Sequence, residues 1–104
     1  MATPELTDQQ RKDALEKATK VRSARKVFKD QVSRGEFSLE EAIRRAKADE
    51  ALAGIRVRDL LQCFQGVGPK RAAGVMEEVG ISSARRIRGL GAHQVHDLLA
   101  RENT

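Results

Sequence analysis

The residues best suited to chemistry in this sequence form the segment Gly66-Val67-Gly68-Pro69-Lys70-Arg71. Glycine opens backbone angles that are closed to other residues and removes side chains that would block a close approach. Pro69 fits the first position of a helix, because its missing N–H is not needed there. The free amides of that first turn lie at the positive end of the helix dipole, where a phosphate oxygen binds well. Lys70 and Arg71 oppose the dipole, so their placement makes more sense if an anion binds beside them.

A second constellation of the same kind lies 23 residues further along, at Gly89-Leu90-Gly91. Three arginines come just before it, Arg85, Arg86 and Arg88. Ser82 fits as the cap of a short helix that carries them. Because few acidic residues lie nearby in the sequence, these guanidinium groups are not all expected to form ion pairs. Unpaired guanidinium groups beside free backbone amides are typical of a nucleic-acid contact surface.

Each of these features also has an interpretation without a ligand. A Gly-Val-Gly turn is by itself equally typical of a tight connection between two helices, and a group of arginines is often an ordinary solvated surface. The combination of turn, proline and following cations favours phosphate binding. The exposure of the turns and the ion pairs of their cations distinguish the two interpretations.

The first element that must position these turns is a long helix. Thr7 to Gln10 form a capping box, and neither Gly nor Pro occurs again before Gly35. A helix about 40 Å long exceeds what so small a domain covers, so its N-terminal part is expected to project or to lie over a partner. Five of its basic side chains lie in or beside a thin apolar stripe and are either phosphate contacts or an ordinary solvated face: Arg11, Arg22, Arg25, Lys26 and Lys29.

The remaining elements are also predicted to be helical. A second capping box at Ser38 to Glu41 starts a helix that runs to about Ala48. Residues 57–64 repeat apolar side chains at i, i+3, i+4 and i+7, which is the pattern of a buried helical face. Further helices are expected from Pro69 to Gly80 and over 92–101. No segment alternates in the manner of a strand, so the predicted fold class is all-α.

Charge and glycine are distributed unevenly along the 104 residues. Residues 1–50 contain 12 basic and 10 acidic side chains, whereas residues 51–104 contain seven of the eight glycines. We therefore expect an N-terminal helical arm over 1–50, made of the long helix and the second helix, and a compact, turn-rich domain over 51–104. The formal net charge of +5 favours an anionic partner.

Several function classes are disfavoured. His93 and His96 have a spacing that suits a metal, but no third ligand is evident, because the single Cys63 is expected on a buried helix. No carboxylate dyad, catalytic triad or nucleotide-binding glycine motif occurs, so we expect neither an enzyme nor a cofactor. No apolar run approaches the roughly 20 residues that span a bilayer, and no signal peptide is seen. We expect a monomeric cytoplasmic protein.

Two segments carry a family resemblance. Leu60 to Gly80, with its Gly-Val-Gly-Pro-Lys-Arg-Ala turn, resembles a helix-hairpin-helix or helix-two-turn-helix module. The segment Arg85-Arg86-Ile87-Arg88-Gly89-Leu90-Gly91-Ala92-His93-Gln94 is similar to the signature of the actinobacterial integration host factor family, and the segments around Leu6 to Arg11 and Ala14 to Ala18 also match. The resemblance implies a nucleoid-associated protein that binds and bends double-stranded DNA with little sequence preference. It also implies assistance to phage integrase in some hosts.

The resemblance implies the following contact positions. The family's DNA contacts fall on Gly66, Gly68, Lys70 and Arg71 in the first turn, and on Arg85, Arg86, Arg88, Gly89 and Gly91 around the second. From the arm, four of its basic residues are the candidate contacts: Arg22, Arg25, Lys26 and Lys29. Two other functions remain open at this point: an RNA-binding or ribosome-associated module, and a protein–protein adaptor that uses the N-terminal helix.

Overall fold

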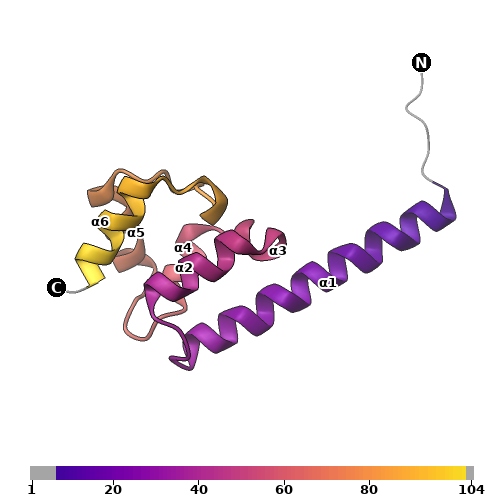
Figure 1. The fold of residues 1–104 in the computed structure, drawn as a ribbon, viewed down its shortest axis with the longest axis horizontal. Helices are drawn as coiled ribbons and strands as arrows, with labels where there is room; N and C mark the ends of the chain where they lie inside the picture. Colours follow the sequence, from indigo (N-terminus) through magenta and orange to yellow (C-terminus); the bar gives the residue numbers. More distant parts are fainter. Residues whose placement is uncertain (1–6, 103–104) are drawn as a thin grey trace, which may run out of the picture.

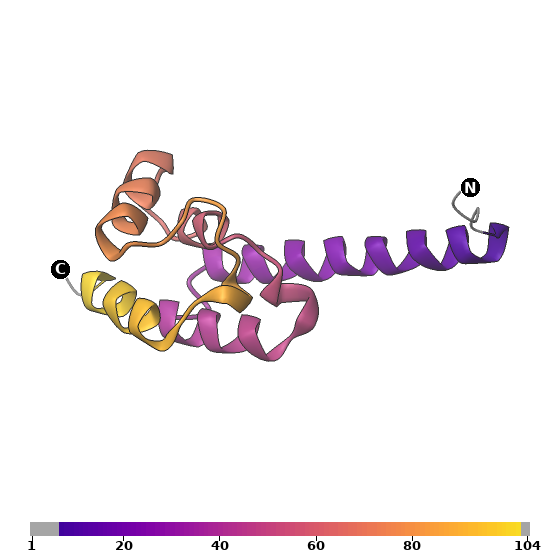
Figure 2. The same cartoon turned by 90° about the horizontal axis from the view of Figure 1, so that it is seen from above.

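The computed structural model describes residues 7–102, and the fold in this range is all-α, as the sequence predicts. Residues 1–6, at the start of the predicted arm, and residues 103–104, at the end of the predicted domain, lie outside the described residues. A long helix, α1, extends away from a group of shorter helices (Figures 1 and 2). The molecule measures 53 × 33 × 24 Å. No helix within residues 7–102 combines the length and hydrophobicity needed to cross a membrane.

The long helix α1 spans Asp8–Ser33, as its cap residues predict. The Thr7 hydroxyl accepts from the amide of Gln10 at 3.1 Å, and the Gln10 side chain accepts from the amide of Thr7 at 2.9 Å. This capping box satisfies two donors that a helix start leaves unpaired. At the other end Gly35 has φ 79°, a left-handed conformation that glycine adopts without strain. Every residue from 8 to 20 is exposed, so the N-terminal half of α1 projects from the core.

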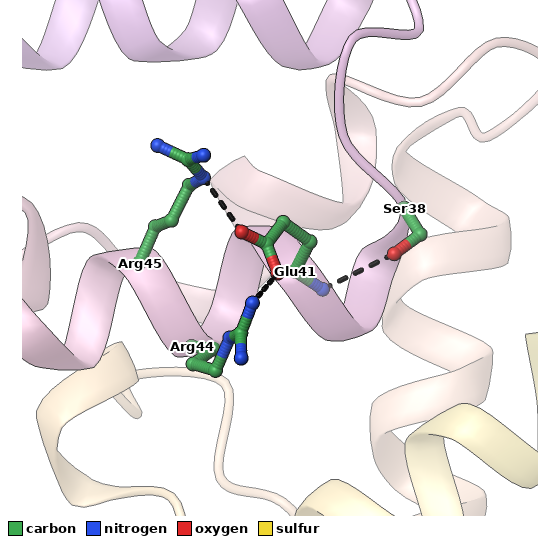
Figure 3. A network of polar contacts seen from close by, with 4 residues as sticks. All are labelled: Ser38, Glu41, Arg44 and Arg45. Atoms are coloured by element: carbon green, nitrogen blue, oxygen red, sulfur yellow. Dashed lines mark hydrogen bonds and ion pairs between the residues drawn. The ribbon is translucent and has the colours of Figure 1, made fainter.

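The helix α2 spans Leu39–Ala48, and only half of its predicted capping box forms. The Ser38 hydroxyl accepts from the amide of Glu41 at 3.2 Å. The Glu41 carboxylate accepts instead from Arg44 and, at 2.8 Å, from Arg45, so it does not return to the cap (Figure 3). The Arg44 bond is the main reason why the pKa of Glu41 lies below its usual value, and the Arg45 bond adds to it.

The other helices are short and closely connected. The segment after α2 forms the short helix α3, Glu50–Ala53, which Asp49 caps. Four elements follow: α4 (Val57–Gln62), α5 (Pro69–Val79), the 3-10 helix η1 (Ile87–Gly89) and α6 (Ala92–Glu102). The helix α5 begins at its proline and ends at Gly80, whose φ is 81°. Both boundaries agree with the prediction from these two residues.

A single hydrophobic core joins these elements. Phe28 and Val32 at the end of α1 pack with α2 residues such as Ile43 and with Leu60 and Leu98 further along the chain. Ile81, Ile87 and Leu90 are buried and anchor the second turn in this core. The core therefore extends across residue 50, the predicted boundary between the arm and the domain.

Candidate nucleic-acid interface

The first glycine turn lies on the surface, between α4 and α5. Gly66 has φ 80°, and Gly66 and Gly68 are both exposed. Val67 is partly buried against the core and so holds the turn in place. Gly68 has φ −87°, and a Cβ added to it would meet nothing within 4 Å. The fold itself therefore does not require glycine at position 68, whereas the close approach of a ligand would.

The start of α5 carries unpaired donors, as the sequence predicts. Gly68 precedes α5 without a side-chain cap, and the amide of Ala72 is the first of this helix to find a main-chain acceptor, the carbonyl of Gly68 at 3.0 Å. Within residues 7–102 the amides of Lys70 and Arg71 have no hydrogen-bond acceptor. Their side chains are exposed and form no ion pair with any described carboxylate. This end of α5 can thus present both backbone donors and two cations to a phosphate.

The second turn is held by pairing with the segment between α3 and α4. Arg86 forms an isolated antiparallel bridge with Arg56. The amide of Ile87 donates to the carbonyl of Ile55 at 2.9 Å, and the amide of Val57 donates to the carbonyl of Arg85 at 3.0 Å. The short helix predicted from Ser82 is therefore wrong: the backbone at Arg86 is extended, with φ −98° and ψ 158°, and the 3-10 helix η1 follows it.

The backbone donors of the second turn are already used. The amides of Gly89 and Leu90 donate within the turn, and the amide of Gly91 donates to the side chain of Gln94 at 3.1 Å. Arg85 lies across the turn and donates to the carbonyl of Gly89 at 2.8 Å. The prediction of free amides is therefore correct for the first turn and wrong for the second. Contacts at the second turn depend on side chains and on the close approach of its backbone.

Three arginines from distant parts of the sequence converge on Gly54, at the end of α3. Arg25 of α1 donates through Nε to the carbonyl of Ala51 at 2.8 Å, and Arg86 donates to the carbonyl of Gly54 at 2.5 Å. A Cβ added to the buried Gly54 would collide with Nη2 of Arg25 and lie 3.2 Å from Nη2 of Arg88. Glycine at this position therefore makes room for guanidinium groups. We call Arg25, Arg86 and Arg88 the Gly54 arginine cluster.

No carboxylate neutralises this cluster within the described part of the chain. The acidic groups that form ion pairs there do so elsewhere: Glu36 with Arg34, Glu41 with Arg44 and Arg45, Glu78 with Arg101. Three like charges held together without a counter-ion repel one another, and an anion between them would relieve that repulsion.

Sequence reasoning missed Gly54, and one signal in the sequence could have drawn attention to it. Gly54 is the sole glycine between Gly35 and Gly66, in a segment whose turn does not require one, since its φ is −81°.

The helix α1 runs past both turns and connects their surroundings. Arg25 contacts the turn at Gly54, and Lys29, one helical turn later, lies near Cys63 at the end of α4. Burial is the main reason why the pKa of the Cys63 thiol is raised, and the charge of Lys29 partly opposes that rise. Arg22 and Lys26 are exposed on this side of α1. The structure thus places Arg25 and Lys29 against the shorter helices, and all four predicted arm cations lie C-terminal to the projecting residues 8–20.

The two turns do not share one site. Gly66 and Arg71 border a groove together with Arg34, Gly35 and Arg101. No member of the Gly54 arginine cluster borders this groove.

His93 and His96 have a spacing that suits a metal, although no metal site is predicted there. Both are exposed on α6, and His96 lies 3.6 Å from the carboxylate of Asp97. Residues 7–102 contain no group of three His, Cys, Asp or Glu side chains placed to hold a metal ion.

The family of S13-like H2TH domains matches residues 32–102, from the end of α1 to the end of α6. Both turns and all helices after α1 lie within this range, so the chain is an S13-like H2TH-domain protein. Two mycobacterial proteins named Integration host factor, from Mycobacterium tuberculosis and Mycolicibacterium smegmatis, are each 43% identical over 99 residues, covering 95% of this chain and 94% of the relative. The Integration host factor of Streptomyces coelicolor is 41% identical over 98 residues, covering 94% and 92%. The chain belongs to this integration host factor family.

A solved structure is similar over most of the chain. It contains sIHF bound to an 8-bp palindromic DNA, with a TM-score of 0.78 and 38% sequence identity. The similarity covers 84% of this chain and 97% of that chain. The family resemblance and the all-α fold predicted from the sequence are both confirmed.

Proposed function

We propose that this protein is an architectural, nucleoid-associated DNA-binding protein that holds duplex DNA by its backbone and bends it, without catalysing a reaction. The observation that carries this proposal is the Gly54 arginine cluster, in which Arg25, Arg86 and Arg88 converge without a carboxylate partner. The likeness to sIHF bound to DNA supports the same conclusion. Phosphate is the anion that such a cluster binds best, because guanidinium groups donate in a planar fork that matches its oxygens.

The first turn is proposed to hold one phosphate strand. The free amides of Lys70 and Arg71 and their two cations act on the same anion, and the open space at Gly68 lets the backbone approach it. These contacts fix the position of the protein on DNA but carry no sequence information. They therefore fit binding with little sequence preference.

The second turn is proposed to hold the facing strand or to enter the minor groove. Arg88 is exposed and has no hydrogen-bond partner among the described residues, so it is free to reach outward. Arginine inserted into a narrow minor groove reads shape more than base identity. Arg85 and Arg86 already donate to backbone carbonyls, and they position the turn while adding positive charge. Gly89 and Gly91 allow the backbone of this turn to approach the duplex closely.

The arm is proposed to complete the bend. Arg22, Lys26 and Lys29 extend the basic surface along α1, beside the Gly54 arginine cluster. If α1 follows the duplex while the turns hold it, contacts on two sides bend the DNA. Six to eight neutralised phosphates would give a log-log salt slope of about −0.9 per contact.

The cellular role follows from the names of the relatives. They are named Integration host factor, which supports a role beside phage integrase on DNA and a place in the cytoplasm on the nucleoid. We expect the protein to act as a monomer on each site.

One experiment tests the proposal. A duplex with fluorophores at both ends is titrated with the protein at several salt concentrations, and the end-to-end distance is read by energy transfer. We expect affinity to fall steeply with salt and the distance to shorten on binding. Structured RNA is the competitor, and RNA that wins by a wide margin would show an RNA-binding module instead. Absent or salt-independent DNA affinity would favour a protein–protein adaptor.

A further inference from the structure

The groove beside the first turn has the form of a small-molecule site. It encloses about 470 Å³ between the end of α1, the first turn, α5 and the end of α6. Sites for small molecules are concave, range over roughly 300–1,000 Å³, and combine an apolar lining with a few placed polar groups. The helices α5 and α6, which form two of its walls, lie side by side away from the projecting end of α1 (Figure 2).

The floor of this groove is apolar. Leu61, Leu98 and Val32 form its base, and Phe64, Val67 and Val75 are partly buried around it. A Cβ added to Gly35 or Gly66 would meet nothing within 4 Å, so both glycines leave the mouth open. Burying apolar surface on such a floor stabilises a complex by about 25 cal/mol per Å².

The rim of the groove is cationic. Arg34, Arg71 and Arg101 border it, and none of the residues that line it is acidic. Arg34 pairs with Glu36 and Arg101 with Glu78, but all four of these side chains are well exposed, so the pairs are weak. Arg71 forms no ion pair with a described carboxylate. An anionic group is therefore favoured at the rim above an apolar floor.

We propose that this groove binds a small amphipathic organic anion, with an apolar body on the floor and a carboxylate, sulfonate or phosphate at Arg71. A DNA backbone supplies the charge but no large apolar body, because its sugars present only small C–H surfaces between successive phosphates. The ligand chemistry thus differs from that of DNA. Gly66 and Arg71 belong to both sites, so ligand and DNA compete. This competition rests on the proposed function, whereas the binding itself does not.

The binding is tested with two matched fluorescent probes. Anilinonaphthalene sulfonate carries an aromatic body and an anion, and the neutral phenylnaphthylamine lacks the anion. We expect the protein to bind the sulfonate about tenfold more tightly than the neutral probe. The variant Arg71→Gln should remove that preference and leave the affinity for the neutral probe unchanged. Equal binding of both probes, or no binding, would overturn the proposal.

The location is tested by filling the groove. Val75→Phe is expected to weaken both probes about tenfold, and Val79→Phe, four residues later on α5 and outside the groove, serves as the control. If either variant fails to fold, the site is located in the unmodified protein, from the methyl resonances that shift when the sulfonate is added. The sulfonate must shift the methyl resonances of Val67, Val75 and Leu98, and shifts confined to Val27 or Leu52, which border a different hollow, would refute the location.

The competition is tested by adding duplex DNA. A saturating duplex is expected to weaken sulfonate binding several-fold, and the sulfonate to weaken DNA binding by the same factor, because coupling between two ligands is reciprocal. Val75→Phe should abolish this coupling while changing DNA affinity less than about twofold. A protein that binds DNA but not the probe refutes only the groove, and one that binds the probe but not DNA refutes only the proposed function.

Discussion

Arg25 and Arg88 are 63 positions apart in the sequence, yet their guanidinium groups both lie against Gly54. Arg25 comes from the long helix and Arg88 from η1, so this contact joins the arm to the second turn. Gly54 is buried between them and provides the space that the two side chains occupy. The orientation of α1 relative to the turn is therefore fixed in part at one glycine, where a side chain would separate the two cations.

Gly54→Ala is expected to weaken DNA binding while leaving the fold intact. The added methyl collides only with the ends of two flexible side chains, and φ is −81°, so the backbone is not strained. We expect the free energy of unfolding to change by less than about 1 kcal/mol and DNA affinity to fall roughly threefold to tenfold. Thermal unfolding and duplex titration measure the two effects.

Gly74→Ala is the matched control for this variant. Gly74 lies inside α5, where an added Cβ meets nothing within 4 Å. Alanine there should stabilise the helix by roughly 0.5–1 kcal/mol and leave DNA affinity unchanged. Equal affinity of Gly54→Ala and the unmodified protein would show that the Gly54 arginine cluster does not contact DNA.

Arg88→Gln is expected to lower DNA affinity about tenfold near 0.1 M salt and to reduce the salt slope by about 0.9, the contribution of one phosphate contact. Because the exposed Arg88 forms no hydrogen bond among residues 7–102, the free energy of unfolding should change by less than about 0.5 kcal/mol. Arg44→Gln removes the same charge from a side chain that Glu41 already neutralises. A similar loss of affinity in both variants would mean that only net charge matters.

The helices and their ends could be predicted because local residues determine them. Thr7 with Gln10 starts α1, Pro69 starts α5, and Gly80 ends it, each through a conformational preference that acts within a few residues. The capping box at Ser38 was only half correct, because Glu41 had two arginines as alternative donors on its own helix. Local rules fail where a side chain has more than one partner within reach.

The arrangement of the site could be predicted only in part, because tertiary contacts determine it. Arg25, Arg86 and Arg88 were each recognised as candidates, but their meeting at Gly54 depends on how α1 packs on the turn after α3. The amides of the second turn are not free, because carbonyl groups of the turn and the side chain of Gln94 accept their hydrogen bonds. Such pairings link positions with no periodic relationship in the sequence.

Glu41→Gln is expected to reduce stability at neutral pH and to have less effect in acid. The bond from Arg44, and after it that from Arg45, lowers the pKa of Glu41 below its usual value near 4.5. A carboxyl with a lowered pKa stabilises the fold above its unfolded pKa, and this stabilisation is lost as the pH falls through the folded pKa. The difference in melting temperature between the two proteins should therefore be constant near neutral pH and shrink below about pH 4.5.

Glu40→Gln is the control for the pH series. Glu40 is the neighbouring acidic residue in the first turn of α2 and has no ion pair among residues 7–102. Its substitution removes the same charge but no arginine bond. If both variants depend on pH in the same way, the contacts in Figure 3 do not contribute to stability in solution.

The double variant Arg22→Gln, Lys26→Gln is expected to reduce DNA bending more than DNA affinity. At about 100° per residue these two side chains lie on one face of α1, on the side of Arg25 and Lys29, whereas Lys17 and Lys20 lie on the opposite face. The turns retain their contacts in the variant, so binding should weaken only about threefold to tenfold, while the end-to-end distance of the bound duplex lengthens toward that of free DNA. Lys17→Gln, Lys20→Gln removes the same charge from exposed positions of the same helix and should leave the bend unchanged. Energy transfer at saturating protein measures the bend independently of affinity. If both double variants bend the duplex as much as the unmodified protein does, α1 takes no part in bending, and the bend must arise from the two turns alone.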